Sequence, residues 1–160
     1  MMKNASEVIE LLAGRTLATA ESCTGGGVGQ ALTAVPGASA VYKGGIISYC
    51  NEVKAKLLGV SGNVLEKYGP VSSQVAEAMA SGARKALDAD IAVSVTGLAG
   101  PTGDGYGNPV GTVFIGYADS RVCLSEKFHF SGDRDAVRTQ SVAAALELIL
   151  KFAERDEDPV

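Results

Sequence analysis

The spacing of apolar residues along the chain predicts alternating helices and strands. Apolar side chains that recur every three or four residues predict helices, and short apolar or alternating runs predict strands. On this basis we expect helices over residues 4–13, from about 27 to 35, over 51–58, from 72 to about 87, and from 133 to about 153. Strands are expected over residues 16–21, 40–49, 91–96, 111–118 and 122–130.

The order of these elements predicts an α/β fold. Helices and strands alternate up to residue 96, and a β-hairpin around Asp119-Ser120 follows a glycine-rich loop over residues 97–109. We expect a three-layer α/β/α sandwich around a mixed, mostly parallel sheet, in a single domain. The domain is expected to span residues 1–160, with a core of about 5–153 and an acidic tail over 154–160.

Charge and cysteine content narrow the choice of partners. With 14 basic and 18 acidic residues the 160-residue chain has a net charge of −4, and its longest basic run is Arg84-Lys85. We therefore expect no nucleic-acid partner, whereas a small anionic ligand needs only one or two cations and some amides. No apolar run approaches the roughly 18 residues of a membrane span. Three cysteines without CxxC spacing, Cys23, Cys50 and Cys123, are typical of reduced thiols in a cytoplasmic protein.

Three segments with polar residues and glycines follow three of the predicted strands. They are Glu-Ser-Cys-Thr-Gly-Gly at 21–26, Tyr-Cys-Asn-Glu-Val-Lys at 49–54, and Thr-Gly-Leu-Ala-Gly-Pro at 96–101. Ligands of open α/β sheets bind outside the carboxyl ends of the strands. If the three strands are parallel, the segments meet in one place and form a single site.

Ser22 stands on the predicted turn between a strand and a helix. The first amides of that helix favour negative charge, which suits a phosphate or the oxyanion of a tetrahedral intermediate. A helix cap of Ser and Thr, with glycines for the turn, explains the same pattern without chemistry. Cys23 adds a thiol nucleophile as a further alternative, although only the helix end would lower its pKa.

A nucleophilic serine needs a base within hydrogen-bond reach. The one histidine, His129, lies in an alternating strand with Ser125 and Lys127, so we interpret it as a solvated strand residue and expect no Ser-His-Asp triad. Lys54 is the better candidate, provided that burial and a neighbouring cation lower its pKa from about 10.4 to roughly 7–8. A surface lysine beside Lys56 is the alternative.

Five sequence blocks identify a family resemblance over about residues 5–153. The chain resembles the C-terminal domain of CinA-type competence/damage-inducible proteins and their stand-alone nicotinamide-nucleotide amidohydrolase relatives. The blocks are Glu21-Ser22-Cys23-Thr24-Gly25-Gly26, Tyr49-x-Asn51-x-x-Lys54, Thr96-Gly97-x-Ala99-Gly100-Pro101, Pro109-Val110-Gly111-Thr112-Val113 and Gly132-Asp133-Arg134-x-x-Val137-Arg138. The set in this order is specific to the family, although each block alone is a weak signal.

The resemblance implies hydrolysis of the carboxamide of nicotinamide mononucleotide to nicotinic acid mononucleotide and ammonia. It implies a Ser–Lys mechanism with no metal and no cofactor, in a homo-oligomer. Ser22 would be the nucleophile and Lys54 its base, with Tyr49 and Thr96 as supporting hydroxyls. The implied substrate-binding residues are Cys23, Thr24, Gly25, Gly26, Asn51, Gly97, Gly100, Arg134 and Arg138. The amides of the 23–26 turn would serve as oxyanion or phosphate donors, and either arginine would meet the phosphate.

The chain departs from the family pattern at three places. Cys50 stands where serine is common, the 103–107 loop reads Gly-Asp-Gly-Tyr-Gly, and Asn108 precedes Pro109 where lysine is frequent. The last two change charge and shape near the expected ligand, so reaction type is better determined than substrate preference. We expect no counterpart of the N-terminal domain of full-length CinA proteins, and we expect the chain to act alone. A nucleotide-binding sensor module without catalysis remains the alternative function.

Overall fold

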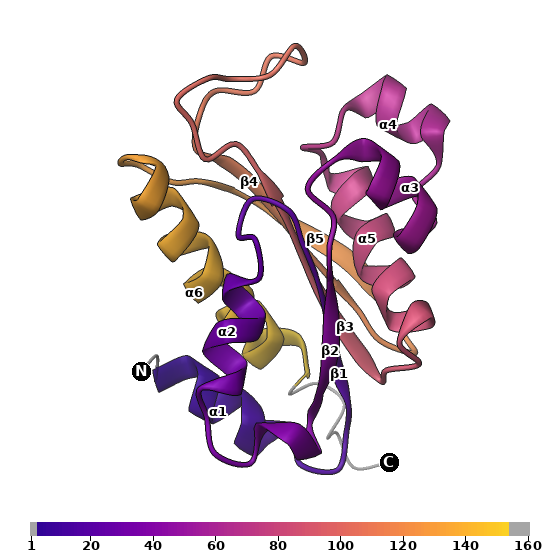
Figure 1. Ribbon diagram of the computed structural model, residues 1–160, viewed down its shortest axis with the longest axis vertical. Helices are drawn as coiled ribbons and strands as arrows, with labels where there is room; N and C mark the ends of the chain where they lie inside the picture. The colour runs from indigo at the N-terminus through magenta and orange to yellow at the C-terminus, as the bar shows by residue number, and fades with distance from the viewer. Residues whose placement is uncertain (1–2, 154–160) are drawn as a thin grey trace.

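A five-stranded sheet with the order β2-β1-β3-β4-β5 runs through the centre of the computed structural model, which describes residues 3–153 (Figure 1). The strands are β1 (Leu17–Glu21), β2 (Tyr42–Ile47), β3 (Ile91–Gly97), β4 (Thr112–Ala118) and β5 (Cys123–His129). β1 pairs in parallel with β2 and β3, while β4 pairs antiparallel with β3 and β5. Only β4 therefore runs against the others, and the mixed, mostly parallel sheet is confirmed.

Helices cover both faces of this sheet (Figure 1). They are α1 (Lys3–Leu11), α2 (Gly27–Thr33), α3 (Asn51–Leu58), α4 (Gly62–Tyr68), α5 (Ser73–Ala86) and α6 (Arg134–Ala153), with a 3-10 turn at Ala38–Ala40. α1, α2 and α6 form one outer layer, and α3, α4 and α5 form the other. The predicted three-layer α/β/α sandwich is confirmed. The predicted acidic tail lies outside the described residues.

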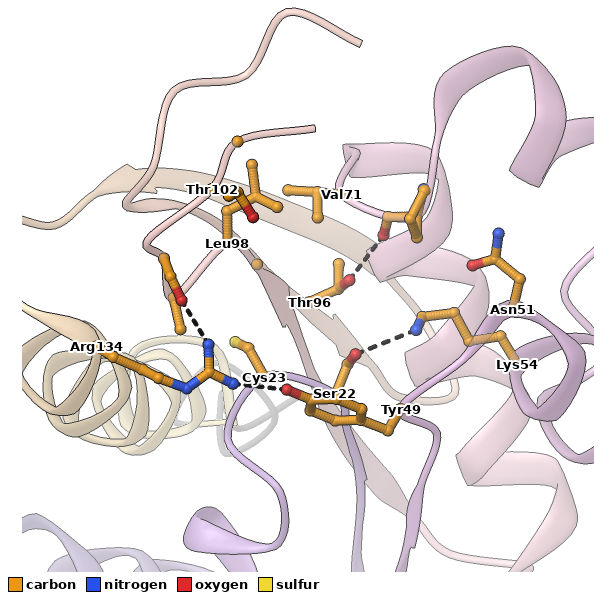
Figure 2. Close-up of a pocket in the computed structure, with 15 residues that line it drawn as sticks. Ser22, Cys23, Tyr49, Asn51, Lys54, Val71, Thr96, Leu98, Thr102 and Arg134 are labelled. Carbon is orange, nitrogen blue, oxygen red and sulfur yellow. Dashed lines mark hydrogen bonds between the residues drawn. The ribbon is translucent and has the colours of Figure 1, made fainter. Parts of the chain in front are cut away.

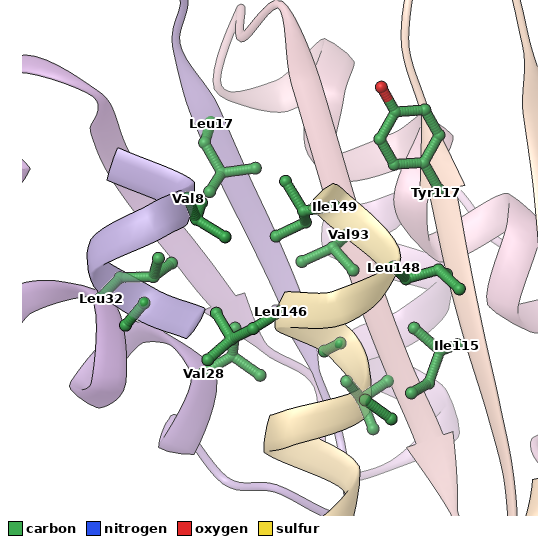
Figure 3. Packing of buried hydrophobic residues seen from close by; sticks show 14 of the residues in the cluster. Val8, Leu17, Val28, Leu32, Val93, Ile115, Tyr117, Leu146, Leu148 and Ile149 are labelled. Carbon is green, nitrogen blue, oxygen red and sulfur yellow. The ribbon is translucent and has the colours of Figure 1, made fainter. Parts of the chain in front are cut away.

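The hydrophobic core has two parts because successive side chains of a strand point to opposite faces. Leu17 of β1 packs into a large cluster with α1, α2 and α6, to which Leu146 and Ile149 belong (Figure 3). Its neighbour Ala18 packs into a smaller cluster with α5, which includes Met79. Both faces of β1 and β3 are thus buried, and the polar side chains in their middles, Thr19 and Ser94, are fully buried and hydrogen-bonded.

Side-chain caps fix the starts of the two longest helices. The Ser72 hydroxyl accepts from the Val75 amide at 3.3 Å, and the Asp133 carboxylate accepts from the Ala136 amide at 2.9 Å. Both starts agree with the sequence prediction. Capping satisfies amides that have no partner inside the helix, so α6 begins at a defined place.

Two predictions of local structure were wrong. The strand expected over 40–49 is shorter, because residues 38–40 form the 3-10 turn and the chain leaves the sheet after Ile47 to enter α3. α4 was not predicted, because its short span holds only Val64 and Leu65 as aliphatic residues and shows no repeating apolar stripe.

Within residues 3–153, no helix combines the length and the apolar character that crossing a membrane requires.

Candidate active site

The three segments singled out in the sequence converge on one pocket of about 270 Å³ (Figure 2). β1, β2 and β3 are parallel, so their carboxyl ends lie at the same edge of the sheet. Ser22 follows β1, Tyr49 follows β2, and Thr96 lies at the end of β3; all three line the pocket. The start of α6 closes the pocket with Arg134.

Ser22 is held in place by its backbone. Its amide donates to the carbonyl of Val95 on β3 at 2.9 Å, and its carbonyl accepts from the Gly25 amide at 3.0 Å. The turn into α2 passes through Gly26 with φ 105°, a left-handed conformation that glycine adopts without strain. The side chain of Ser22 is 8% exposed and faces the pocket. The chain therefore presents this hydroxyl in a fixed direction.

Lys54 reaches Ser22 from α3. Its Nζ atom donates to Ser22 Oγ at 3.1 Å (Figure 2). It also donates to the carbonyl of Ser48 at 2.8 Å. The side chain is 2% exposed, and no carboxylate within residues 3–153 forms an ion pair with it. Burial lowers the pKa of Lys54 below its usual value, against the smaller opposing effects of Cys50 and Cys23. The amine thus loses its proton more readily than a surface lysine, as a general base requires.

Neither alternative nucleophile system fits the pocket. His129 is exposed on β5 and does not line the pocket, so it is not available as a base. Cys23 does line the pocket, but burial raises the pKa of its thiol to about 11. Since the thiolate is the reactive form, Cys23 is a poor nucleophile near neutral pH.

Tyr49 and Thr96 line the pocket, but their hydroxyls bond away from the Ser22–Lys54 pair. The Tyr49 hydroxyl accepts from Arg134 at 2.7 Å, and its ring is 61% exposed. The Thr96 hydroxyl donates to the carbonyl of Pro70 at 2.7 Å. Tyr49 therefore joins the loop after β2 to α6, and Thr96 joins β3 to the connection between α4 and α5 (Figure 2).

The two arginines of α6 have different surroundings. Arg134 lines the pocket and bridges two of its walls, because it also donates to the carbonyl of Gly100 at 2.6 Å. Arg138, one turn later, donates to the carbonyls of Cys23 at 3.0 Å and Thr24 at 3.3 Å. It lines a separate groove between α2 and α6. Arg134 thus faces the pocket, while Arg138 supports the turn that carries Ser22.

The turn after β1 offers fewer free amides than its sequence suggested. The amides of Val28 and Gly29 donate to the carboxylate of Glu21, to which we assigned no role from the sequence. No acceptor within residues 3–153 meets the amides of Cys23 and Thr24. Thr24, Gly25 and Gly26 do not line the pocket, whereas Cys23 does. Among the four residues of the 23–26 turn, Cys23 alone both lines the pocket and has an amide with no acceptor within residues 3–153.

The remaining walls come partly from residues that the sequence did not indicate. Asn51, Gly97 and Gly100 line the pocket, as expected. The added residues are Pro70, Val71, Leu98, Ala99, Thr102 and Gly103. Pro70 and Val71 belong to the connection between α4 and α5, and the rest belong to the loop after β3. Since both segments lack charged groups at these positions, this wall is largely apolar.

The loop after β3 is tied to α4 and to the connection that follows it. The Tyr106 hydroxyl donates to the carbonyl of Glu66 at 2.9 Å, and the Asn108 side chain donates to the carbonyl of Val71 at 3.1 Å. A Cβ atom at Gly69 would lie 2.6 Å from the Tyr106 ring, so only glycine allows this contact. The two departures from the family pattern, at 103–107 and at Asn108, therefore contain the residues that attach this loop to α4 and to the connection after it.

The site contains no arrangement suited to a metal ion. Across residues 3–153, no cluster of three or more His, Cys, Asp or Glu side chains is placed to hold one. The groups that converge are instead a hydroxyl, a buried amine, an amide and a guanidinium. They suit nucleophilic attack on a carbonyl compound that carries an anionic group.

Known proteins share both sequence and fold with this chain. A nicotinamide-nucleotide amidohydrolase, PncC, of Pseudomonas putida is 47% identical over 84% of the chain and 84% of its own length. A CinA-like protein of Geobacter metallireducens is 48% identical over 84% of the chain, which spans 32% of that protein. The chain thus covers about a third of such longer relatives.

Solved structures agree with this relationship. A CinA superfamily protein of Escherichia coli matches with a TM-score of 0.90 at 36% identity, covering 92% of this chain and 87% of that one. One of Klebsiella pneumoniae matches with a TM-score of 0.93 at 32% identity, covering 96% and 97%. The family model described as CinA C-terminal domain matches residues 2–153. The chain belongs to the CinA C-terminal domain family.

Proposed function

We propose that the chain is an amidase that hydrolyses the carboxamide of nicotinamide mononucleotide, with Ser22 as nucleophile and Lys54 as its base. The contact of 3.1 Å between Lys54 Nζ and Ser22 Oγ, inside a pocket, carries this proposal. The name of the Pseudomonas putida relative supports the substrate, since that protein matches along most of its length.

In the first half of the reaction, neutral Lys54 takes the proton of the Ser22 hydroxyl as Oγ bonds to the amide carbon. The tetrahedral oxyanion accepts a hydrogen bond from the Cys23 amide. The carbon–nitrogen bond then breaks, and the Lys54 ammonium gives its proton to the departing nitrogen, which leaves as ammonia. Ser22 is left as an ester of the pyridine carboxylate, and Lys54 is neutral again.

Water completes the second half with the same groups. Lys54 takes a proton from water, and the hydroxide bonds to the ester carbon. The bond from that carbon to Ser22 Oγ then breaks, and Oγ regains a proton from the Lys54 ammonium. One amide and one water thus give one carboxylic acid and one ammonia. In each half of the reaction Lys54 first accepts a proton as base and then returns it as acid.

The walls of the pocket suit the two ends of a pyridine nucleotide. Val71 and Leu98 give an apolar surface for a flat ring close to Ser22. Arg134 places an exposed guanidinium at the rim, and its two bonded partners, Tyr49 and Gly100, are neutral. Guanidinium groups bind phosphate well because they donate two parallel hydrogen bonds. We assign the phosphate to Arg134 rather than to Arg138.

Ammonia release from nicotinamide mononucleotide tests this function. The wild-type protein and a Ser22→Ala variant are incubated with the substrate, and ammonia and the acid product are measured over time. We expect release by the wild type and none above background by the variant, whose thermal unfolding temperature should match. Wild-type turnover by Ser22→Ala would exclude the mechanism. Thermal stabilisation of the wild type by the nucleotide without any product would favour a binding module instead.

A further inference from the structure

Glu21 is a buried carboxylate directly before the proposed nucleophile. It ends β1, is only 2% exposed, and does not line the pocket. No lysine or arginine within residues 3–153 forms an ion pair with it. Burying a charge without a counter-ion is costly, so its retention next to Ser22 calls for an explanation.

Three hydrogen bonds take the place of a counter-ion. Oε1 accepts from the Thr24 hydroxyl at 2.7 Å and from the Val28 amide at 2.8 Å. Oε2 accepts from the Gly29 amide at 3.1 Å. Two of these donors are first-turn amides of α2, where a negative charge is favoured. The carboxylate thus connects the end of β1 to the start of α2 across the turn that carries Ser22.

The backbone of Glu21 also supports the base. Its carbonyl accepts from the Ser48 amide at 2.7 Å, and the carbonyl of Ser48 accepts from Lys54 Nζ at 2.8 Å. Lys54 Nζ in turn donates to Ser22 Oγ. A closed ring of contacts therefore runs through Glu21, Ser48, Lys54 and Ser22, and the Glu21 side chain anchors it to α2.

We propose that Glu21 is a positioning residue, whose carboxylate holds the Ser22 turn so that Oγ stays within reach of Lys54. This inference rests on the proposed Ser–Lys function. Because its carboxylate occupies the first-turn amides of α2, these amides are closed to the substrate. Glu21 itself touches neither the substrate nor the reacting atoms. A misplacement of about 1 Å at a reacting group is enough to cost roughly a hundredfold in rate, so the effect belongs to the chemical step.

The test compares Glu21→Gln with Asp90→Asn, a matched loss of a carboxylate charge. Asp90 accepts from the amide and the hydroxyl of Thr16 at 2.8 and 3.1 Å, at the opposite ends of β1 and β3. The probe is methanesulfonyl fluoride, with mass spectrometry to locate the label. Ser22 Oγ bonds to its sulfur, the sulfur–fluorine bond breaks, fluoride leaves, and Lys54 takes the hydroxyl proton. The rate constant of labelling, kcat and KM are measured well below the unfolding temperature.

We expect Glu21→Gln to slow both labelling and turnover by about tenfold or more, with KM within about threefold of wild type. Asp90→Asn should be labelled at close to the wild-type rate even if its unfolding temperature falls equally. Labelling of Glu21→Gln at the wild-type rate would overturn the proposal, and so would equal slowing in both variants.

A second variant covers the case in which Glu21→Gln does not fold. Thr24→Val removes one donor and leaves the carboxylate in place, and we expect a smaller but measurable slowing of labelling. Labelling of Thr24→Val at the wild-type rate would then overturn the proposal. Labelling does not depend on the natural substrate. If labelling responds as expected while nicotinamide mononucleotide is not hydrolysed, the proposed substrate fails and the positioning role stands.

Discussion

The parallel and antiparallel halves of the sheet contribute differently to the pocket. In the parallel half, β1, β2 and β3 bring Ser22, Lys54 and Thr96 to one edge. In the antiparallel half, β4 runs back across the molecule, and β5 returns to that edge and leads into α6 with Arg134. The parallel half thus supplies the groups to which we assign the reaction, and the antiparallel half supplies a group at the rim. The parallel strands place side chains in the pocket at their carboxyl ends, whereas the antiparallel strands lead the chain to the pocket's rim.

Burial follows the same division. Lys54 is 2% exposed beside the parallel strands, whereas Lys127 and His129 are exposed on β5. Burial lowers the pKa of Lys54 because it disfavours the charged amine. Residue type alone therefore does not decide which group acts as the base; depth beneath the helices does.

Replacing one lysine beside each half of the sheet, Lys54 or Lys127, should produce the largest difference in kcat. We expect Lys54→Met to lower kcat by about a thousandfold, because the proton of Ser22 loses its acceptor. Lys127→Met should stay within about twofold of wild type, since surface substitutions away from a site have small effects. Steady-state amidase kinetics measure both variants. A loss of similar size in both would mean that the two halves share the chemistry.

Variants of the two arginines of α6 distinguish the contribution of the pocket rim from that of the turn that carries Ser22. We expect Arg134→Gln to raise KM by about tenfold or more with kcat nearly unchanged, because it removes a charged hydrogen bond to the phosphate. Arg138→Gln should mainly lower kcat, because Arg138 holds the carbonyls of Cys23 and Thr24. The kinetic constants of the two variants, measured side by side, check this. A raised KM in Arg138→Gln alone would reverse our assignment.

Substitution of two glycines tests whether a packing change beside each half of the sheet also alters catalysis in the pocket. A Cβ atom at Gly82 of α5 would lie 1.9 Å from the carbonyl oxygen of Leu58 in α3, and one at Gly116 of β4 would lie 2.3 Å from that of Ala76 in α5. We expect either substitution by alanine to cost about 1–3 kcal/mol in the free energy of unfolding. Only Gly82→Ala displaces the helix that carries Lys54, so it alone should also lower kcat, by roughly tenfold. Urea unfolding and kinetics distinguish the two effects.

The smallest expected effect is a dependence of stability on pH. Because the pKa of Lys54 is lowered in the folded state, the unfolded chain binds this proton more tightly, and folding is penalised below the ordinary pKa of 10.5. As pH rises from the folded-state pKa toward 10.5, the penalty disappears and the wild type gains stability relative to Lys54→Met. Urea unfolding between about pH 7 and 10 measures this difference. Lys127→Met controls for the loss of one lysine, and a difference that stays flat would contradict burial as the cause.

Sequence patterns predicted the site where its residues are local to strand ends. Ser22, Lys54 and Thr96 each follow a recognisable strand, and parallel pairing was enough to bring them together. Pro70 and Val71 were missed because they belong to a connection with no motif of its own. Whether a wall residue lies near the nucleophile depends on how α4 and α5 pack, which periodicity does not encode.

Hydrogen-bond partners were harder to predict than positions. The family resemblance implied that the Tyr49 hydroxyl supports the reacting pair, but this hydroxyl accepts from Arg134, which is distant in sequence. Glu21 was missed because a carboxylate at a strand end is usually solvated, and only the path of α2 shows that it is buried. The helices, strands and layers were largely predicted, because each rests on a repeated local pattern. The hydrogen-bond partners were not predicted, since each depends on a single tertiary contact.

The loop after β3 is attached to the rest of the molecule through residues that form no hydrogen bond with Ser22 or Lys54, so its sequence is able to change while that pair stays in place. Tyr106 and Asn108 fasten this loop to α4 and to Val71, and neither contacts Ser22 or Lys54. Thr102 and Gly103, which precede these residues in the loop, line the pocket, so substitutions there alter the pocket wall while Ser22 keeps its hydrogen bond to Lys54. A lysine in place of Asn108 would replace the amide that bonds to Val71 and Asp104 with a longer, charged group, and would so change how the loop is attached. Under the proposed mechanism, this loop adjusts which amide is admitted while the Ser22–Lys54 pair is retained.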